Sequence, residues 1–72
     1  MSRFVGGIEK NWRERIEVRE DEYRGHLYVD IRIYWRADQN DEWKPSKKGV
    51  TLKPSLVKEL ITLLQKAEKE EK

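Results

Sequence analysis

The clearest alternation of hydrophobic and polar positions runs from residue 26 to residue 35. Apolar side chains take one parity and polar or aromatic side chains the other: Leu27, Val29, Ile31 and Ile33 against Tyr28, Asp30, Arg32 and Tyr34. Successive side chains of a strand point to opposite faces, so this segment predicts a β-strand with one apolar face. Aromatic rings interleaved with cations on the other face, with Trp35 at the strand end, are typical of surfaces that stack nucleobases.

Weaker patterns predict three more strands. From Trp12 onward, apolar positions alternate with polar ones: Trp12, Ile16 and Val18 against Arg13, Arg15, Glu17 and Arg19. Residues 20–25 read as the hairpin connection and 36–41 as a second reversal, since both are rich in turn-forming residues. A short extended segment at 43–45, a turn at 46–49 and a fourth strand at 50–52 follow. Residues 1–11 are weakly patterned and are expected to form a flexible N-terminal segment.

The last element is an amphipathic helix that begins at Pro54, whose fixed φ suits the first helical turn. Its apolar stripe is wide: Leu56, Val57, Leu60, Ile61, Leu63, Leu64 and Ala67. Such a stripe exceeds what packing on one small sheet needs, so we expect a dimer interface through Leu56, Leu60, Leu63 and Leu64. The predicted fold is α+β, four antiparallel strands and then one helix, with a single domain at 12–67 and a charged, frayed tail at 68–72.

Composition narrows the picture. A chain of 72 residues without cysteine has no disulfide or thiolate metal site to stabilise it. It buries only about 60 per cent of the surface it exposes when unfolded, which favours a partner chain. Lys and Arg exceed Asp and Glu by two, so the arrangement of charge, rather than its total, has to indicate a nucleic-acid partner. No apolar run approaches a membrane span or a signal peptide, and we expect a soluble, intracellular protein.

Cations gather in two places, at Lys44, Lys47 and Lys48 and on the arginine face of the first two predicted strands. If the strands pair as a meander, these cations line one groove and contact phosphates without regard to sequence. Asp30 shares that face and is expected to hold a neighbouring arginine in place. The plain alternatives are a solvated turn for the lysines and core packing for Trp35 and Trp43, while Trp12 is assigned to core or dimer contacts.

Two segments carry a family resemblance: VDIRIYW at 29–35, and WKPSKKGVTL at 43–52 directly before the helix. Together they resemble the single-stranded-DNA-binding domain of the positive cofactor four family of transcriptional coactivators, in a minimal prokaryotic or viral form. The resemblance implies a homodimer whose helices pair at the centre and whose curved sheets present concave basic and aromatic surfaces. It implies DNA contacts at these matching positions: Arg19, Tyr23, Arg32, Trp35, Lys44 and Lys48.

The functional expectation is a homodimeric, sequence-independent binder of single-stranded DNA or melted duplex that acts as an accessory factor in transcription, replication or repair. Its predicted binding residues are Arg13, Arg15, Arg19, Tyr23, Arg32, Trp35, Lys44, Lys47 and Lys48. Two alternatives stay open: preference for RNA, and a protein-interaction module that docks a polymerase or regulator. His26 stands alone and no catalytic motif occurs, so neither an enzyme, a cofactor nor a metal site is expected.

Overall fold

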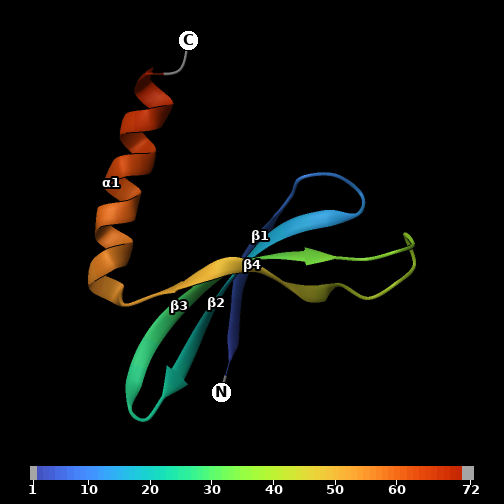
Figure 1. Cartoon of the computed structure of the whole chain (residues 1–72), viewed down its shortest axis with the longest axis horizontal. Helices are drawn as coiled ribbons and strands as arrows, with labels where there is room; N and C mark the ends of the chain where they lie inside the picture. Colours follow the sequence, from blue (N-terminus) through green and yellow to red (C-terminus); the bar gives the residue numbers. More distant parts are fainter. Residues whose placement is uncertain (1, 71–72) are drawn as a thin grey trace.

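Four antiparallel strands and one helix make up the computed structural model, which describes residues 2–70, Glu70 by its backbone alone (Figure 1). The elements are β1 (Arg3–Glu9), β2 (Glu14–Tyr23), β3 (His26–Trp35), β4 (Lys44–Leu52) and α1 (Pro54–Glu70). The strands lie in the sheet in chain order, β1-β2-β3-β4. The predicted order of four strands followed by a helix is therefore confirmed.

The β2–β3 hairpin sets the two faces of the sheet. Ile16 pairs with Ile33 and Val18 with Ile31 on the apolar face. On the polar face the cross-strand pairs are Arg15 with Tyr34, Glu17 with Arg32, and Arg19 with Asp30. The hairpin is longer than the sequence suggested: β2 continues to Tyr23, and the reversal needs only Arg24 and Gly25, with φ of 53° and 80°. Positive φ at both central positions is what a tight two-residue hairpin requires.

Two parts of the sheet differ from the prediction. Arg3–Glu9, expected to be flexible, forms β1 and pairs with β2. Its alternation is hidden in the sequence because Gly6 and Gly7 carry no side chains and the register shifts between Phe4 and Gly6. The segments expected at 43–45 and 50–52 belong to one strand, β4, because the predicted turn at 46–49 is a register irregularity opposite Arg32 and Tyr34.

The helix α1 begins at Pro54, as predicted, and the carbonyl of Lys53 accepts hydrogen bonds from the amides of Leu56 and Val57 at 3.0 and 3.1 Å. It leaves the end of β4, contacts β3 and β4 sparingly and runs away from the sheet (Figure 1). The tail expected to fray at 68–72 is helical through Glu70, and its last two residues lie outside the described part. No helix within residues 2–70 is long and apolar enough to cross a membrane.

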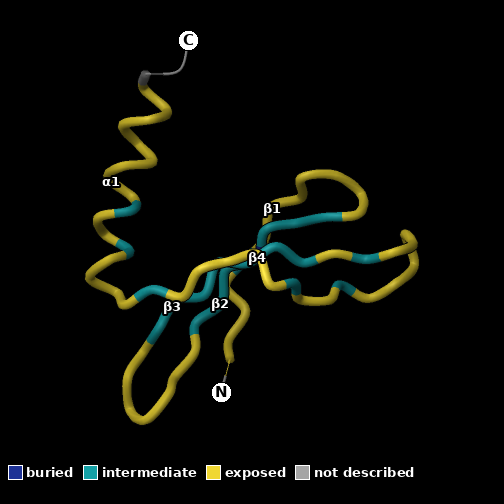
Figure 2. The backbone as a smooth tube through the Cα atoms, viewed as in Figure 1, coloured by how far each residue is buried: buried dark blue, intermediate teal, exposed yellow. Residues whose placement is uncertain are grey.

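A single chain does not form a hydrophobic core. Among residues 2–69 no hydrophobic side chain is buried, and the one buried residue is Glu17, 4% exposed. Partly covered positions follow the sheet, whereas the helix is almost wholly exposed (Figure 2). The radius of gyration is 13.9 Å, against roughly 11 Å for a compact domain of this length. The apolar sheet face and the helix stripe are therefore left open in the single chain.

Candidate nucleic-acid interface

Asp30 holds Arg32 on the polar face of the sheet. Nε and Nη2 of Arg32 donate to the two carboxylate oxygens of Asp30 at 3.1 and 2.8 Å, and the Thr51 hydroxyl donates to the same carboxylate at 2.9 Å. The hydrogen bonds from Arg32, and secondarily the one from Thr51, lower the pKa of Asp30, and Asp30 in turn raises the pKa of Arg32. The expectation that Asp30 fixes a neighbouring arginine is confirmed. The third guanidinium nitrogen, Nη1, donates to the Ser46 carbonyl at 3.0 Å.

Glu17 is the acidic centre of the same face. Its Oε1 accepts from Nε and Nη2 of Arg19 at 3.1 and 2.8 Å, while its Oε2 lies 3.4 Å from Nε of Arg15. The bond to Glu17 raises the pKa of the Arg19 guanidinium. The guanidinium of Arg15 crosses over Gly7 of β1, where even a methyl group would collide with it. Two arginines predicted to bind phosphates are therefore fixed by one buried carboxylate.

Aromatic rings continue this network along the polar face. The guanidinium groups of Arg15, Arg19 and Arg36 each lie within 6 Å of a ring centroid, in the range of cation–π attraction. The distances are 5.2 Å for Arg19 to Tyr34, 5.3 and 5.8 Å for Arg19 and Arg15 to Phe4, and 5.4 and 4.2 Å for Arg15 and Arg36 to Trp43. We call this series the arginine–aromatic ladder: Tyr34, Arg19, Phe4, Arg15, Trp43 and Arg36. It orients these cations on the polar face of the sheet, where the side chains of Arg15 and Arg19 stay partly exposed.

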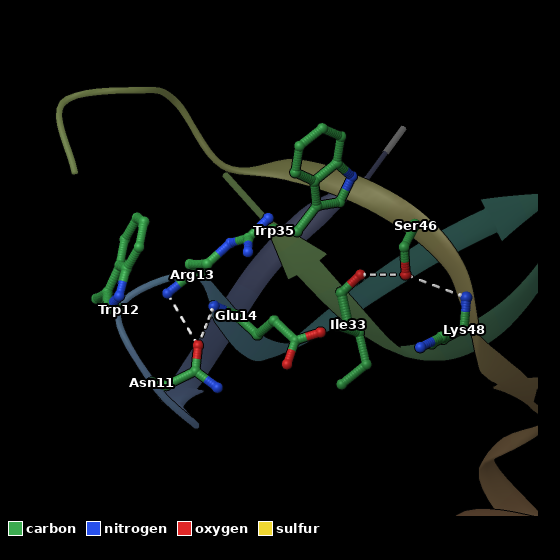
Figure 3. A pocket seen from close by; sticks show the side chains of 8 residues that line it. All are labelled: Asn11, Trp12, Arg13, Glu14, Ile33, Trp35, Ser46 and Lys48. Atoms are coloured by element: carbon green, nitrogen blue, oxygen red, sulfur yellow. Dashed lines mark hydrogen bonds between the residues drawn. The ribbon is translucent and has the colours of Figure 1, made fainter. Parts of the chain in front are cut away.

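A hollow of about 560 Å³ lies at the end of the sheet where β2 begins and β3 ends. Three segments supply its lining (Figure 3): Asn11, Trp12, Arg13 and Glu14, then Ile33 and Trp35, then Ser46 and Lys48. The Asn11 side-chain oxygen accepts from the amides of Arg13 and Glu14, both at 2.9 Å, and so fixes the turn that precedes β2.

Ser46 organises the β4 wall of the hollow. Its hydroxyl donates to the Ile33 carbonyl at 2.7 Å and accepts from the Lys48 amide at 3.1 Å (Figure 3). Its carbonyl accepts a hydrogen bond from Nη1 of Arg32, which lies on the polar face. One residue thus links the hollow to that face. Beside it, the ammonium of Lys44 lies 5.3 Å from the Trp35 ring centroid.

The structure divides the predicted binding residues among several places. Arg15, Arg19 and Arg32 lie on the polar face, and Arg13, Trp35 and Lys48 line the hollow. Arg13 was predicted to lie on the arginine face of the strand. Because β2 begins only at Glu14, Arg13 precedes the strand and is not part of that face. Tyr23 lies at the far hairpin tip, 61% exposed, and Lys47 is exposed on β4. The expected single groove is therefore a polar face plus a terminal hollow.

Several contributors escaped the sequence interpretation. Trp12, assigned to core or dimer contacts, is 45% exposed and lines the hollow. Phe4 belongs to the segment expected to be flexible, yet it contacts two arginines of the ladder. Glu14 interrupts the apolar positions of β2, and it lines the hollow opposite Trp35. The aromatic identity of Trp12 and Phe4 was a usable signal, but their neighbours depend on strand pairing.

The predicted dimer leucines lie on the exposed helix. Leu56, Leu63 and Leu64 are 45%, 61% and 59% exposed, and Leu60 is partly covered. An apolar stripe this open, beside an apolar sheet face that is also uncovered, is a surface suited to another chain.

Comparison with known proteins connects this geometry to a family. Residues 8–63 match the family model described as Transcriptional Coactivator p15 (PC4). A PC4 homologue from Burkholderia pseudomallei K96243, in its orthorhombic crystal form, is 27% identical, with a TM-score of 0.88 over 97% of this chain and 93% of that one. Its tetragonal form gives 26% identity and a TM-score of 0.84 over 94% and 98% of the two chains.

A third solved structure is the bacteriophage T5 homologue of the eukaryotic transcription coactivator PC4, implicated in recombination-dependent DNA replication. It is 26% identical, with a TM-score of 0.61 over 93% of this chain and 81% of that one. The family model covers most of the chain, and the bacterial and phage structures share its four strands and helix. The protein described here therefore belongs to the PC4 family of transcriptional coactivators.

Proposed function

We propose that this protein is a homodimeric binder of single-stranded DNA that acts as an intracellular accessory factor in transcription, replication or repair. One observation carries the proposal: an exposed tryptophan, Trp35, shares an open hollow with Arg13 and Lys48 and has Lys44 beside its ring. A flat ring flanked by cations matches the chemistry of a nucleotide, since the base stacks and the phosphate pairs with the cation. The PC4 homologues from a bacterium and from phage T5 support the same class of partner.

The binding mechanism follows from the two parts of the surface. Bases stack on Trp35, and each stacked base contributes about 1–3 kcal/mol without regard to its identity. Phosphates pair with Arg13 and Lys48 beside the hollow, and the polar face of the sheet offers further cations, which Asp30 and Glu17 hold in fixed orientations. An unpaired strand suits this arrangement, because in a duplex the faces of the bases are covered by their neighbours.

Lack of a core supports the homodimer. Fully burying a leucine stabilises a fold by about 1.5–3 kcal/mol, and the helix keeps Leu56, Leu63 and Leu64 largely exposed in one chain. A second copy offers the same stripe and the same open sheet face, so a two-fold pairing covers both at once. We infer that α1 packs against α1 of a second copy through Leu56, Leu60, Leu63 and Leu64.

Fluorescence anisotropy tests the proposal directly. A labelled mixed-sequence strand of about 20 nucleotides is titrated at several salt concentrations, with matched duplex and RNA as competitors. We expect binding that salt weakens, that duplex competes poorly and that Trp35→Ala weakens about 5- to 150-fold, the loss that one stacked base predicts. Lys48→Ala should lower the slope of log affinity against log salt by about 0.7, the value for one lost phosphate contact on a single strand.

Lys58→Ala, on the helix, is the matched control and should leave the salt slope unchanged. Absence of binding at low salt by a folded dimer would overturn the proposal and favour a protein-docking role for the helix and aromatic face. Stronger competition by RNA than by DNA would reassign the substrate to RNA.

A further inference from the structure

The hollow contains a carboxylate, Glu14, although a site that bound only phosphates would not be expected to contain a negative charge. Glu14 lines the hollow together with Arg13 and Lys48, and it is the cross-strand partner of Trp35. Directly paired residues on one sheet face have side chains within contact distance. The side chain of Glu14 runs toward Ile33 within the hollow (Figure 3). A negative charge there repels phosphate, so its presence indicates that the hollow accepts another part of the nucleotide.

The Glu14 carboxylate is free to accept hydrogen bonds. Its one ionic partner among residues 2–70 is Lys10, whose Nζ lies 3.8 Å from Oε1, too far for a hydrogen bond. In that described range no side chain or amide donates a hydrogen bond to either carboxylate oxygen. An ionised carboxylate accepts only and is matched best by two donors side by side.

Guanine is the base that presents such a pair. Its N1–H and N2–H lie next to each other on the Watson–Crick edge. Thymine and uracil present one N–H between two carbonyls, whereas cytosine and adenine present an amino group beside an acceptor nitrogen that would face the carboxylate. Single-stranded bases are read on this edge by side chains while an aromatic ring stacks on the base.

We propose that the hollow is a guanine-reading subsite, in which Glu14 accepts N1–H and N2–H of an unpaired guanine stacked on Trp35. Trp12 forms the opposite wall, and Arg13 and Lys48 hold the adjoining phosphates. The volume, about 560 Å³, lies within the roughly 300–1,000 Å³ of small-molecule sites. This subsite rests on the proposed single-strand function and adds a base preference to binding that is otherwise sequence-independent.

The test compares three labelled strands of about 12 nucleotides by anisotropy: oligothymidylate, the same strand with one central guanine, and the same strand with one central hypoxanthine, which keeps N1–H and lacks the N2 amino group. Wild-type protein should bind the guanine strand about tenfold more tightly than oligothymidylate, as a bidentate base contact gives. Hypoxanthine should give an intermediate affinity. In Glu14→Gln the guanine-to-thymine ratio should fall to about one, while Glu59→Gln on the helix should keep the wild-type ratio.

Each other outcome is decisive. Tight binding of oligothymidylate by the wild type with no gain from guanine would overturn the subsite and leave the proposed function standing. A guanine preference that survives in Glu14→Gln, or that hypoxanthine reproduces in full, would also overturn it. Failure to bind any of the three strands would overturn the single-strand function itself, and with it the subsite.

Discussion

Replacing Glu17 with glutamine tests whether burial, rather than distance, makes an ion pair stabilising in this sheet. Glu17 has a side chain 5% exposed and faces Arg19 at 2.8 Å and Arg15 at 3.4 Å. Glutamine keeps the shape and one acceptor, but it loses the charge and turns an amide donor toward a guanidinium. Removing one partner of a buried ion pair costs about 3–5 kcal/mol. Because Arg15 and Arg19 remain 21% and 31% exposed, water offsets part of this loss, and we expect about 2–3 kcal/mol.

Glu20→Gln is the matched control, three residues along the same strand. Glu20 lies closer to its partner, at 2.7 Å from Arg3, but the two side chains are 42% and 66% exposed. An exposed pair of this kind contributes about 0.2–1 kcal/mol at most. If contact distance alone decided the stability lost, Glu20→Gln would be more destabilising than Glu17→Gln, because the Glu20–Arg3 distance is the shorter one.

Thermal unfolding followed by circular dichroism, at one fixed protein concentration, measures both variants. One kcal/mol shifts the Tm of a domain this size by about 4–8 °C, so Glu17→Gln should melt roughly 10–20 °C below wild type. Glu20→Gln should stay within about 8 °C. Equal shifts for the two variants, or a Glu17→Gln protein as stable as wild type, would refute the argument from burial.

Further expected outcomes concern the sheet, the helix and acid. Gly49→Ala places a methyl group 2.6 Å from the Ile31 carbonyl oxygen and should cost about 1–3 kcal/mol in a urea melt, whereas Gly6→Ala, with open space around it, should be nearly neutral. Leu63→Glu should dissociate the dimer at least tenfold more readily in analytical ultracentrifugation, while Gln65→Glu, which adds the same charge outside the apolar stripe, should not; equal effects would contradict helix pairing. Because the pKa of Asp30 is lowered in the folded state, its contribution is complete above the unfolded value of about 3.9 and is lost as pH falls through the folded value. Wild type should therefore lose stability in acid more steeply than Asp30→Asn does, in melts recorded from neutral pH downward.

Some strands could be predicted from the sequence and others could not, depending on whether side-chain alternation or backbone pairing defines them. The alternation from His26 to Trp35 is unbroken, and Arg24 and Gly25 mark its start, so side-chain pattern alone was sufficient for β3. Pattern failed for β1, where two glycines and a register shift erase the alternation and backbone pairing with β2 supplies the order. It failed again in β4, where turn-forming residues fill an irregular register inside one strand.

The candidate site was anticipated in its residue types more than in its geometry. Trp35 and Lys48 share one hollow, and Arg32 rests on Asp30, all close to expectation. The burial of Glu17 was not foreseeable, because its cover comes from arginines and from β1, which meet only after the sheet has formed. Glu14 likewise acquires a role only through the register that pairs it with Trp35.

The tip of the β2–β3 hairpin stands outside the sheet. Pairing of β1 with β2 reaches no further than Glu20, and pairing of β4 with β3 no further than Val29, so residues 21–28 form a two-stranded arm. An isolated two-stranded hairpin is only marginally stable, so strand amides in this arm should exchange with solvent faster than those of the remaining sheet. Trypsin should cleave first after Arg24, which is exposed in the turn. The turn is the opposite end of the hairpin from the hollow, so a fluorophore or a fused domain inserted between Arg24 and Gly25 would leave the tryptophans of the hollow untouched.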